Sequence, residues 1–215
     1  MPLFSWYNGC GDHINMPKIK QKYGLQKTPE DVRDFPAHLL AGFASPLILP
    51  RSYSVSTPLV IKDQGEFTDM CSAYALTAVS EDQEGVVLDP LYTFARTKQI
   101  MGGDSDAWGA DLRSACKSAV KPYGFIVGDA SVVSVPSTME IRNRALSQFS
   151  KAADAQAAMH RKESYWAVTG PRSVFDNIKS ILWQTRAEER SGLAGADWRP
   201  EWNGKKKGVI EQLGG

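Results

Sequence analysis

The sequence has 215 residues, of which 42% are hydrophobic and 23% are charged, as expected for a globular protein with a buried core. Its formal net charge of +1 lacks the basic excess of dedicated nucleic-acid-binding or membrane-surface proteins. Sparse cysteines (Cys10, Cys71 and Cys116) and no signal-like or membrane-spanning apolar stretch predict a cytoplasmic protein in a reducing compartment.

Composition divides the chain into three parts. Residues 1–57 are rich in Pro, Gly and isolated aromatics without sustained periodicity, which predicts an extended arm lying over the rest of the chain. Residues 58–190 contain the apolar periodicity of a folded domain. Glycines dominate residues 191–215, which predict a tail.

The stretch from Asp63 to Ala75 carries the clearest chemical signal. Cys71 opens a run of small and apolar residues that predicts a helix ending near Asp82. A thiol at a helix N-terminus lies beside unpaired backbone N–H groups, which favour the thiolate. Gln64 can fold back and offer its amide as an oxyanion donor beside the N–H of Cys71. The nearby charge of Asp69 is expected to oppose thiolate formation.

A buried thiol is the alternative interpretation of the same stretch. Cysteine is among the residues most often found in protein cores, and alanine neighbours are typical of core helices. Cys116, on the apolar side of a later helical pattern, is predicted to be such a core thiol.

The remaining pattern predicts mostly helices, with short strands between them. The expected elements are a strand at Leu59–Ile61, a helix introduced by Leu88-Asp89-Pro90, a helix from about Ala110 to Lys121, a strand from Val132 to Val135, a helix from Ser137 to about Lys162, a strand from Tyr165 to Val168 and a helix around Val174 to Leu182.

The stretch around Cys71 resembles the nucleophile segment of the papain-like cysteine peptidases, in which a Gln-Gly pair precedes a Cys followed by small and aromatic residues. Three further segments are similar, in the same order, to bacterial and phage-type members without a long propeptide. They are Asp31-Val32-Arg33-Asp34-Phe35 followed by Leu49-Pro50, Leu88-Asp89-Pro90-Leu91-Tyr92, and Trp108-Gly109-Ala110-Asp111-Leu112-Arg113 with Tyr123-Gly124. The resemblance covers about residues 23–185. It implies an α+β, papain-like fold, mainly its helical half, with a long central helix starting at the cysteine.

The resemblance also implies a site. Cys71 would be the nucleophile and Gln64 the oxyanion donor in peptide-bond hydrolysis through a thioester, with a peptide or protein as substrate and no cofactor. Gly109 would lie where the substrate backbone approaches, because a side chain there would block a pairing peptide. Trp108 replaces the usual glycine of this loop and would narrow the cleft or stack on a substrate side chain, with a packing role as the alternative.

The sequence departs from the family in two respects. The spacing from Gln64 to Cys71 is longer than usual, so the loop between them must bulge. The family takes its base from a Gly-His segment downstream of the cysteine, and no such segment follows here. His13, His38 and His160 are scattered, which also predicts no metal site, and they substitute poorly for that base. The resemblance therefore implies that residues 191–215 begin a missing second half, and that a partner or missing segment supplies the histidine.

Two other functions remain open. Without its histidine, the fold could serve as a non-catalytic peptide-binding or protein-binding module, with Trp108, Trp198 and Trp202 as anchors if they are exposed. The arm and tail also suit a structural component of a larger assembly, whose neighbours they would wrap.

Overall fold

The structure is a computed structural model. The chain divides into two units, Met1–Gln21 with Ala194–Gly215, and Lys22–Leu193, and every described residue lies in the second unit. Apart from residues 25 and 26, the predicted arm (residues 1–57) lies outside the described residues, and so does the whole predicted tail (residues 191–215). The described residues are 25–26, 60–65, 68–103, 107–165, 167, 178–180 and 182–183.

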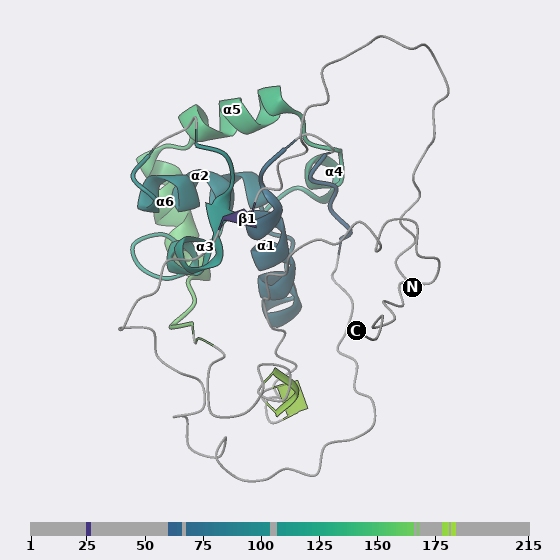
Figure 1. Cartoon of the computed structure of the whole chain (residues 1–215), viewed down its shortest axis with the longest axis vertical. Helices are drawn as coiled ribbons and strands as arrows, with labels where there is room; N and C mark the ends of the chain where they lie inside the picture. Colours follow the sequence, from purple (N-terminus) through teal and green to yellow (C-terminus); the bar gives the residue numbers. More distant parts are fainter. Residues whose placement is uncertain are drawn as a thin grey trace, which may run out of the picture. The chain divides into compact units, whose positions relative to one another are not determined.

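The described part is mainly helical with few, short strands, in agreement with the α+β expectation (Figure 1). The two strands pair in parallel, with Leu25 opposite Ala110 and Gln26 opposite Asp111. The elements are β1 (Leu25–Gln26), α1 (Cys71–Glu84), α2 (Pro90–Ile100), β2 (Ala110–Asp111), α3 (Leu112–Ala119), α4 (Ala130–Val133), α5 (Met139–Gln148), α6 (Lys151–Ala157) and the 3₁₀ helix η2 (Ala158–His160).

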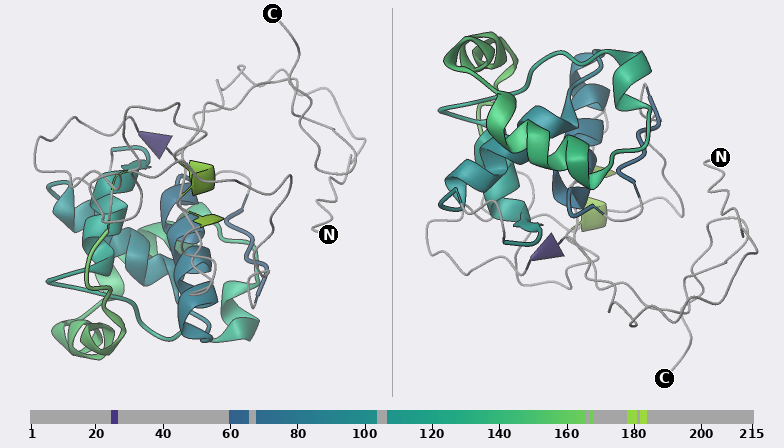
Figure 2. Two further views of the ribbon diagram at one scale, coloured as in Figure 1. Left: turned by 90° about the horizontal axis from the view of Figure 1, so that it is seen from below. Right: turned by 90° about the horizontal axis from the view of Figure 1, so that it is seen from above.

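Helix α2 is at the centre of this arrangement and packs against α1, α3 and α5. Helix α1 packs against both α2 and α3, and α5 crosses α2 near the end of α1 where Cys71 lies (Figures 1 and 2). Small side chains such as Ala73, which is fully buried, allow the close approach. The helix ends at Gly85, whose φ of 69° is left-handed and whose N–H donates to the Glu81 carbonyl at 2.8 Å. The predicted helix starting at Cys71 is confirmed.

Two apolar clusters lie along α1. The first contains Met70, which directly precedes the cysteine, and is formed by Met70, Ala73, Tyr74, Phe94 and Ala110. The second lies further along the helix and is formed by Leu76, Leu88, Ala115, Ala119 and Phe125. The first cluster fixes the end of α1 on which the candidate site depends.

The predicted entry to α2 is confirmed. Asp89 is the N-cap, and its carboxylate accepts hydrogen bonds from the backbone N–H groups of Leu91 at 2.7 Å and Tyr92 at 3.4 Å. Pro90 takes the first helical position, where a missing N–H costs nothing. Helix α3 begins later than predicted, because Ala110–Asp111 pairs with β1 and Asp111 then caps the helix through Ser114 N at 2.9 Å.

Two strand predictions were wrong. Val132 and Val133 lie in the short helix α4, which Asp129 caps by accepting the N–H of Ser131 at 2.8 Å. Val132 is 60% exposed. Ile61 is irregular and 72% exposed, so it is not part of the strand predicted at Leu59–Ile61. Of the strand predicted at Tyr165–Val168, the described residues show a single bridge position at Ala167.

The single helix predicted from Ser137 to Lys162 is broken into α5 and α6. Thr138, not Ser137, is the N-cap of α5, and it accepts the N–H of Ile141 at 3.2 Å. The break falls at Phe149, whose ring packs edge-on against Tyr92 with centroids 5.2 Å apart. The Arg96 guanidinium donates to the Phe149 carbonyl at 3.3 Å. These contacts with α2 hold Phe149 in an extended conformation that helix propensity alone does not predict.

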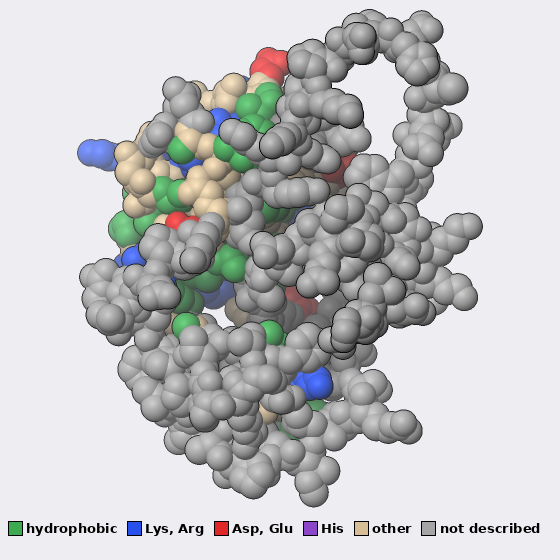
Figure 3. All heavy atoms as spheres, viewed as in Figure 1, with side chains coloured by type: hydrophobic (Ala, Val, Ile, Leu, Met, Phe, Trp, Pro, Cys, Tyr) green, Lys and Arg blue, Asp and Glu red, His purple; other side chains and the backbone are tan. Residues whose placement is uncertain are grey.

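The surface of the described residues shows no concentration of one charge on the face drawn in Figure 3, where acidic and basic side chains are scattered. Within the ranges that the structure describes, no helix has both the length and the apolar character needed to cross a membrane.

Candidate active site

Cys71 is the first residue of α1 and is half-buried. Met70 before it is fully buried and provides no side-chain cap. The first N–H groups of the helix are therefore not occupied by an N-cap side chain, and the dipole of a 14-residue helix ends at the thiol. Cys116, also half-buried, lies inside α3 instead of at a helix terminus. Cys116 also packs against the second apolar cluster, so the two thiols differ both in their position on a helix and in their surroundings.

The Gln64 loop is tied to the body on both sides of the glutamine. The loop begins with Lys62, which is 4% exposed and forms an ion pair with the fully buried Glu81 of α1. Gln64 is half-buried, and its backbone carbonyl accepts the Thr68 hydroxyl. The bulge is expected around Glu66-Phe67-Thr68, of which Glu66 and Phe67 lie outside the described residues. The role of the Gln64 amide stays a prediction.

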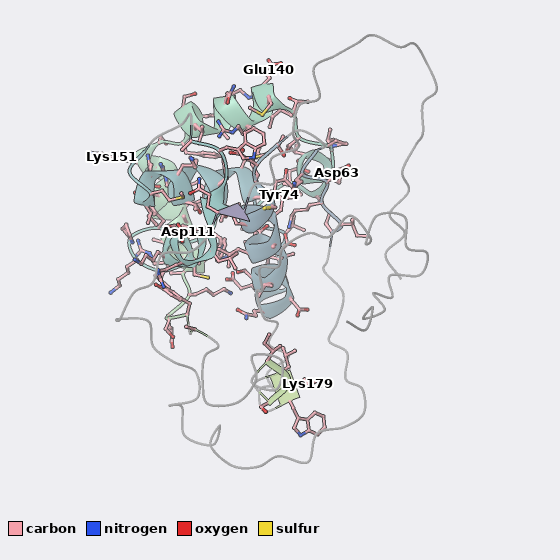
Figure 4. The ribbon with its side chains drawn as sticks, viewed as in Figure 1. Asp63, Tyr74, Asp111, Glu140, Lys151 and Lys179 are labelled. Carbon is pink, nitrogen blue, oxygen red and sulfur yellow. The ribbon has the colours of Figure 1, made fainter. Side chains whose placement is uncertain are left out.

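Gly65 packs directly against the backbone of Ser137. Its φ is +79°, and a Cβ at this position would lie 1.8 Å from the carbonyl oxygen of Ser137. The Ser137 N–H donates to the Asp63 carbonyl at 3.3 Å, and the Ser137 hydroxyl is 2.6 Å from the Tyr74 hydroxyl. Asp63 and Tyr74 accordingly lie at the same end of α1 (Figure 4). A glycine is required at position 65 by both backbone angle and space.

Asp69 lies two positions before the nucleophile candidate and is fully buried. Its carboxylate is held by Arg142 of α5 through two hydrogen bonds, Nε to Oδ1 and a terminal nitrogen to Oδ2, each 2.8 Å. Burial raises the pKa of Asp69, but the hydrogen bonds from Arg142 and Gly109 outweigh burial and hold this pKa below its usual value. The guanidinium offsets the negative charge that was expected to oppose a Cys71 thiolate.

The pKa of Asp69 predicts an acid-dependent contribution to stability. A folded-state pKa below the unfolded value means that this contribution is present above the unfolded pKa and is lost as the pH falls through the folded pKa. We expect the difference in unfolding free energy between wild type and Asp69→Asn to be largest near pH 7 and to shrink below about pH 4. Urea titrations at pH 3 to 7 measure this difference, and a pH-independent difference would contradict the assignment.

The Trp108–Gly109 loop faces Asp69 from the start of β2. Gly109 is buried with a φ of 80°, and its N–H donates to Asp69 Oδ2 at 2.6 Å. The Gly109 carbonyl accepts from Lys98 Nζ at 3.3 Å, and the Trp108 carbonyl accepts from the Gln26 amide. Trp108 itself is half-buried. The backbone N–H of Gly109 is therefore bonded within the protein. Substrate contact at this loop stays a prediction, and it would depend on the Trp108 side chain and on close approach of the substrate backbone to Gly109.

His160 is the one histidine among the described residues, and it lies at the wrong end of α1 for catalysis. Its Nδ1 is 2.8 Å from Oε2 of Glu84, the last residue of the helix. At 1.5 Å per residue, the 14-residue helix is about 20 Å long, so this imidazole cannot reach Cys71. His13 and His38 lie outside the described residues.

The fold matches that of a solved cysteine protease. The similar structure is xylellain, a cysteine protease from Xylella fastidiosa, with a TM-score of 0.54 and 22% sequence identity. The match covers 76% of this chain and 63% of xylellain, so the chain spans less than two thirds of that protease. No protein-family model matches the sequence, and no curated protein matches it. At this identity the likeness to xylellain establishes the fold alone.

Sequence reasoning missed two residues that shape the site, Arg142 and Lys98. Both are almost fully buried, at 4% and 2% exposure, although arginine and lysine are usually exposed. Lys98 lies within the helical pattern of α2 and Arg142 lies among other polar residues of α5, so no local signal distinguished them from exposed residues. Among the described residues, no group of three or more His, Cys, Asp or Glu side chains is placed to hold a metal ion.

Proposed function

We propose that this chain carries the nucleophile-bearing half of a papain-like cysteine peptidase, with Cys71 as the nucleophile. The observation that carries the proposal is the position of Cys71 at the N-terminus of α1, in a chain that shares its fold with a cysteine protease. The two described cysteines are thiols, which suits the reducing, cytoplasmic location that we also propose.

The proposed reaction is acyl transfer. The Cys71 thiolate attacks the peptide carbonyl carbon, and the resulting oxyanion accepts hydrogen bonds from the Cys71 N–H and the Gln64 amide. Collapse of this intermediate breaks the C–N bond, leaves a thioester on Cys71 and releases the amine with one added proton. Water then attacks the thioester carbonyl, the C–S bond breaks, the acyl part leaves as a carboxylic acid, and the sulfur regains its proton as the Cys71 thiol. The proton carrier is a histidine outside the described residues, provided by a partner or by another segment.

Covalent capture by a peptidyl electrophile, such as a peptidyl vinyl sulfone, tests the proposal. We expect adduct formation on Cys71 in wild type and in Cys116→Ser, and none at that site in Cys71→Ser. Mass spectrometry of the intact and digested protein identifies the modified residue. Equal modification of Cys71 and Cys116 would show that the reagent reacts with any available thiol, and would overturn the proposal.

The second candidate is a non-catalytic module that binds peptides on the same scaffold. The position of His160 favours it, because no histidine of the described residues can serve Cys71 as a base. A neutral thiol without a paired imidazole is a poor nucleophile. Peptide binding that survives Cys71→Ala unchanged, together with a lack of capture by the electrophile, would support this function over the first.

A further inference from the structure

Three buried or half-buried side chains bond the backbone of the Trp108–Gly109 loop, and a fourth bonds one of these three. Asp69 accepts the Gly109 N–H at 2.6 Å, and Lys98 Nζ donates to the carbonyls of Ala107 at 2.6 Å and Gly109 at 3.3 Å. Gln26 of β1 donates to the Trp108 carbonyl, and Arg142 holds the carboxylate of Asp69. Three consecutive carbonyls and one N–H of the loop are thus bonded to the body of the protein.

Stability alone does not account for this arrangement. A buried ion pair usually contributes no more to stability than apolar side chains of similar volume. Here the Asp69 carboxylate bonds both the Arg142 guanidinium and a backbone N–H of a distant loop, and Arg142 Cζ also lies 5.4 Å from the centre of the Phe94 ring. Such a network specifies one geometry, which an apolar substitute would not.

The network joins two segments whose separation matters for the proposed reaction, namely the segment that ends at Cys71 and the Trp108–Gly109 loop. Asp69 is separated from Cys71 only by Met70, which is fully buried in the first apolar cluster. Gly109 directly follows Trp108, the side chain expected to meet the substrate. The hydrogen bond between Asp69 and Gly109 therefore links the nucleophile segment to the substrate loop across 40 positions of sequence.

We propose that Asp69 and Arg142 are positioning residues, which hold the Trp108–Gly109 loop at a fixed separation from Cys71 so that a bound peptide meets the thiol. This inference rests on the proposed function. In this role the two side chains act through the loop, because Asp69 is bonded to the Gly109 N–H and to Arg142. A misplacement of about 1 Å is enough to slow a reaction by about a hundredfold, so a network of this kind has a large effect without chemistry of its own.

Two electrophiles distinguish positioning from reactivity. Iodoacetamide reports the thiol alone, whereas the peptidyl vinyl sulfone also needs the loop. In Asp69→Ala we expect the rate of capture by the peptidyl reagent, divided by the rate of alkylation of Cys71 by iodoacetamide, to fall by about tenfold to a hundredfold, since a change in thiolate content caused by the uncompensated Arg142 affects both rates alike. Amide exchange at Gly109 should accelerate by about tenfold or more, because a hydrogen bond to a charged group is lost.

The matched control is Asp154→Asn, which weakens another ion pair of the domain, that between Arg96 Nε and Asp154 Oδ1 at 2.7 Å, without touching the loop. We expect the ratio of the two capture rates and the exchange at Gly109 to stay as in wild type. If Asp69→Ala does not fold, Lys98→Met frees the carbonyls of Ala107 and Gly109 while leaving Asp69 in place, and it should lower the same ratio.

The results separate this inference from the proposed function. An unchanged ratio in both loop variants, or an equal loss in Asp154→Asn, overturns the positioning role while Cys71 remains a captured nucleophile. Failure of wild type to react with the peptidyl reagent overturns the proposed function instead. In that case amide hydrogen exchange at Gly109 tests the positioning role by itself. Faster exchange in Asp69→Ala and Lys98→Met, but not in Asp154→Asn, supports the role, and unchanged exchange overturns it.

Discussion

Replacing Arg142 by leucine should destabilise the folded domain by about 3 to 5 kcal/mol, because it leaves the carboxylate of Asp69 buried without its counter-charge. Asp69 is fully buried and Arg142 is 4% exposed, so water cannot replace the lost hydrogen bonds without local opening. Urea denaturation monitored by circular dichroism gives the unfolding free energies of the two proteins.

Arg144→Leu is the control for this substitution, since Arg144 lies on the same helix α5 and is exposed. We expect a change within about 0.5 kcal/mol. The double variant Asp69→Leu with Arg142→Leu should be more stable than Arg142→Leu alone, because no isolated charge remains. A single variant as stable as Arg144→Leu would contradict the buried ion pair.

Gly65→Ala should cost about 2 to 5 kcal/mol, the combined penalty of a left-handed backbone and of overpacking. Its Cβ would lie 1.8 Å from the Ser137 carbonyl oxygen, so the Gln64 loop or the segment before α5 must move. The same movement should slow capture of Cys71 by the peptidyl electrophile, because Gln64 is adjacent to Gly65.

Gly85→Ala provides the matched control. Gly85 has a similar φ of +69°, but nothing lies within 4 Å of an added Cβ. We expect a cost of about 1 to 2 kcal/mol from the backbone alone and no change in capture. Equal losses of unfolding free energy in the two variants would show that the close contact of Gly65 with Ser137 does not contribute to the cost.

Local sequence signals predicted the elements whose ends are set by neighbours in the chain. Asp89 and Pro90 predict the start of α2, because the side-chain cap of Asp89 and the fixed φ of Pro90 both act within the first helical turn. The break between α5 and α6 could not be predicted in this way. It depends on Phe149 meeting Tyr92 and Arg96 of α2, contacts that arise only after the helices have packed.

The same division applies to the site. The position of Cys71 follows from the small residues after it, so the helix N-terminus was predictable. The partner of Asp69 was not, since Arg142 follows it by 73 positions and nothing in its local sequence distinguishes it from the exposed Arg144. Long-range ion pairs of this kind depend on how the helices pack, and a single sequence does not report that packing.

The most direct test of a nucleophile at the start of α1 is the pH dependence of alkylation, measured separately on Cys71 and Cys116 by mass spectrometry. Both thiols are half-buried, and they differ in their position on a helix. We predict that Cys71 reacts faster at neutral pH and reaches half its maximal rate at a lower pH than Cys116. If Cys71 instead follows Cys116, or an ordinary thiol with a midpoint near about pH 8.5, the helix terminus does not activate it and only the shared fold remains.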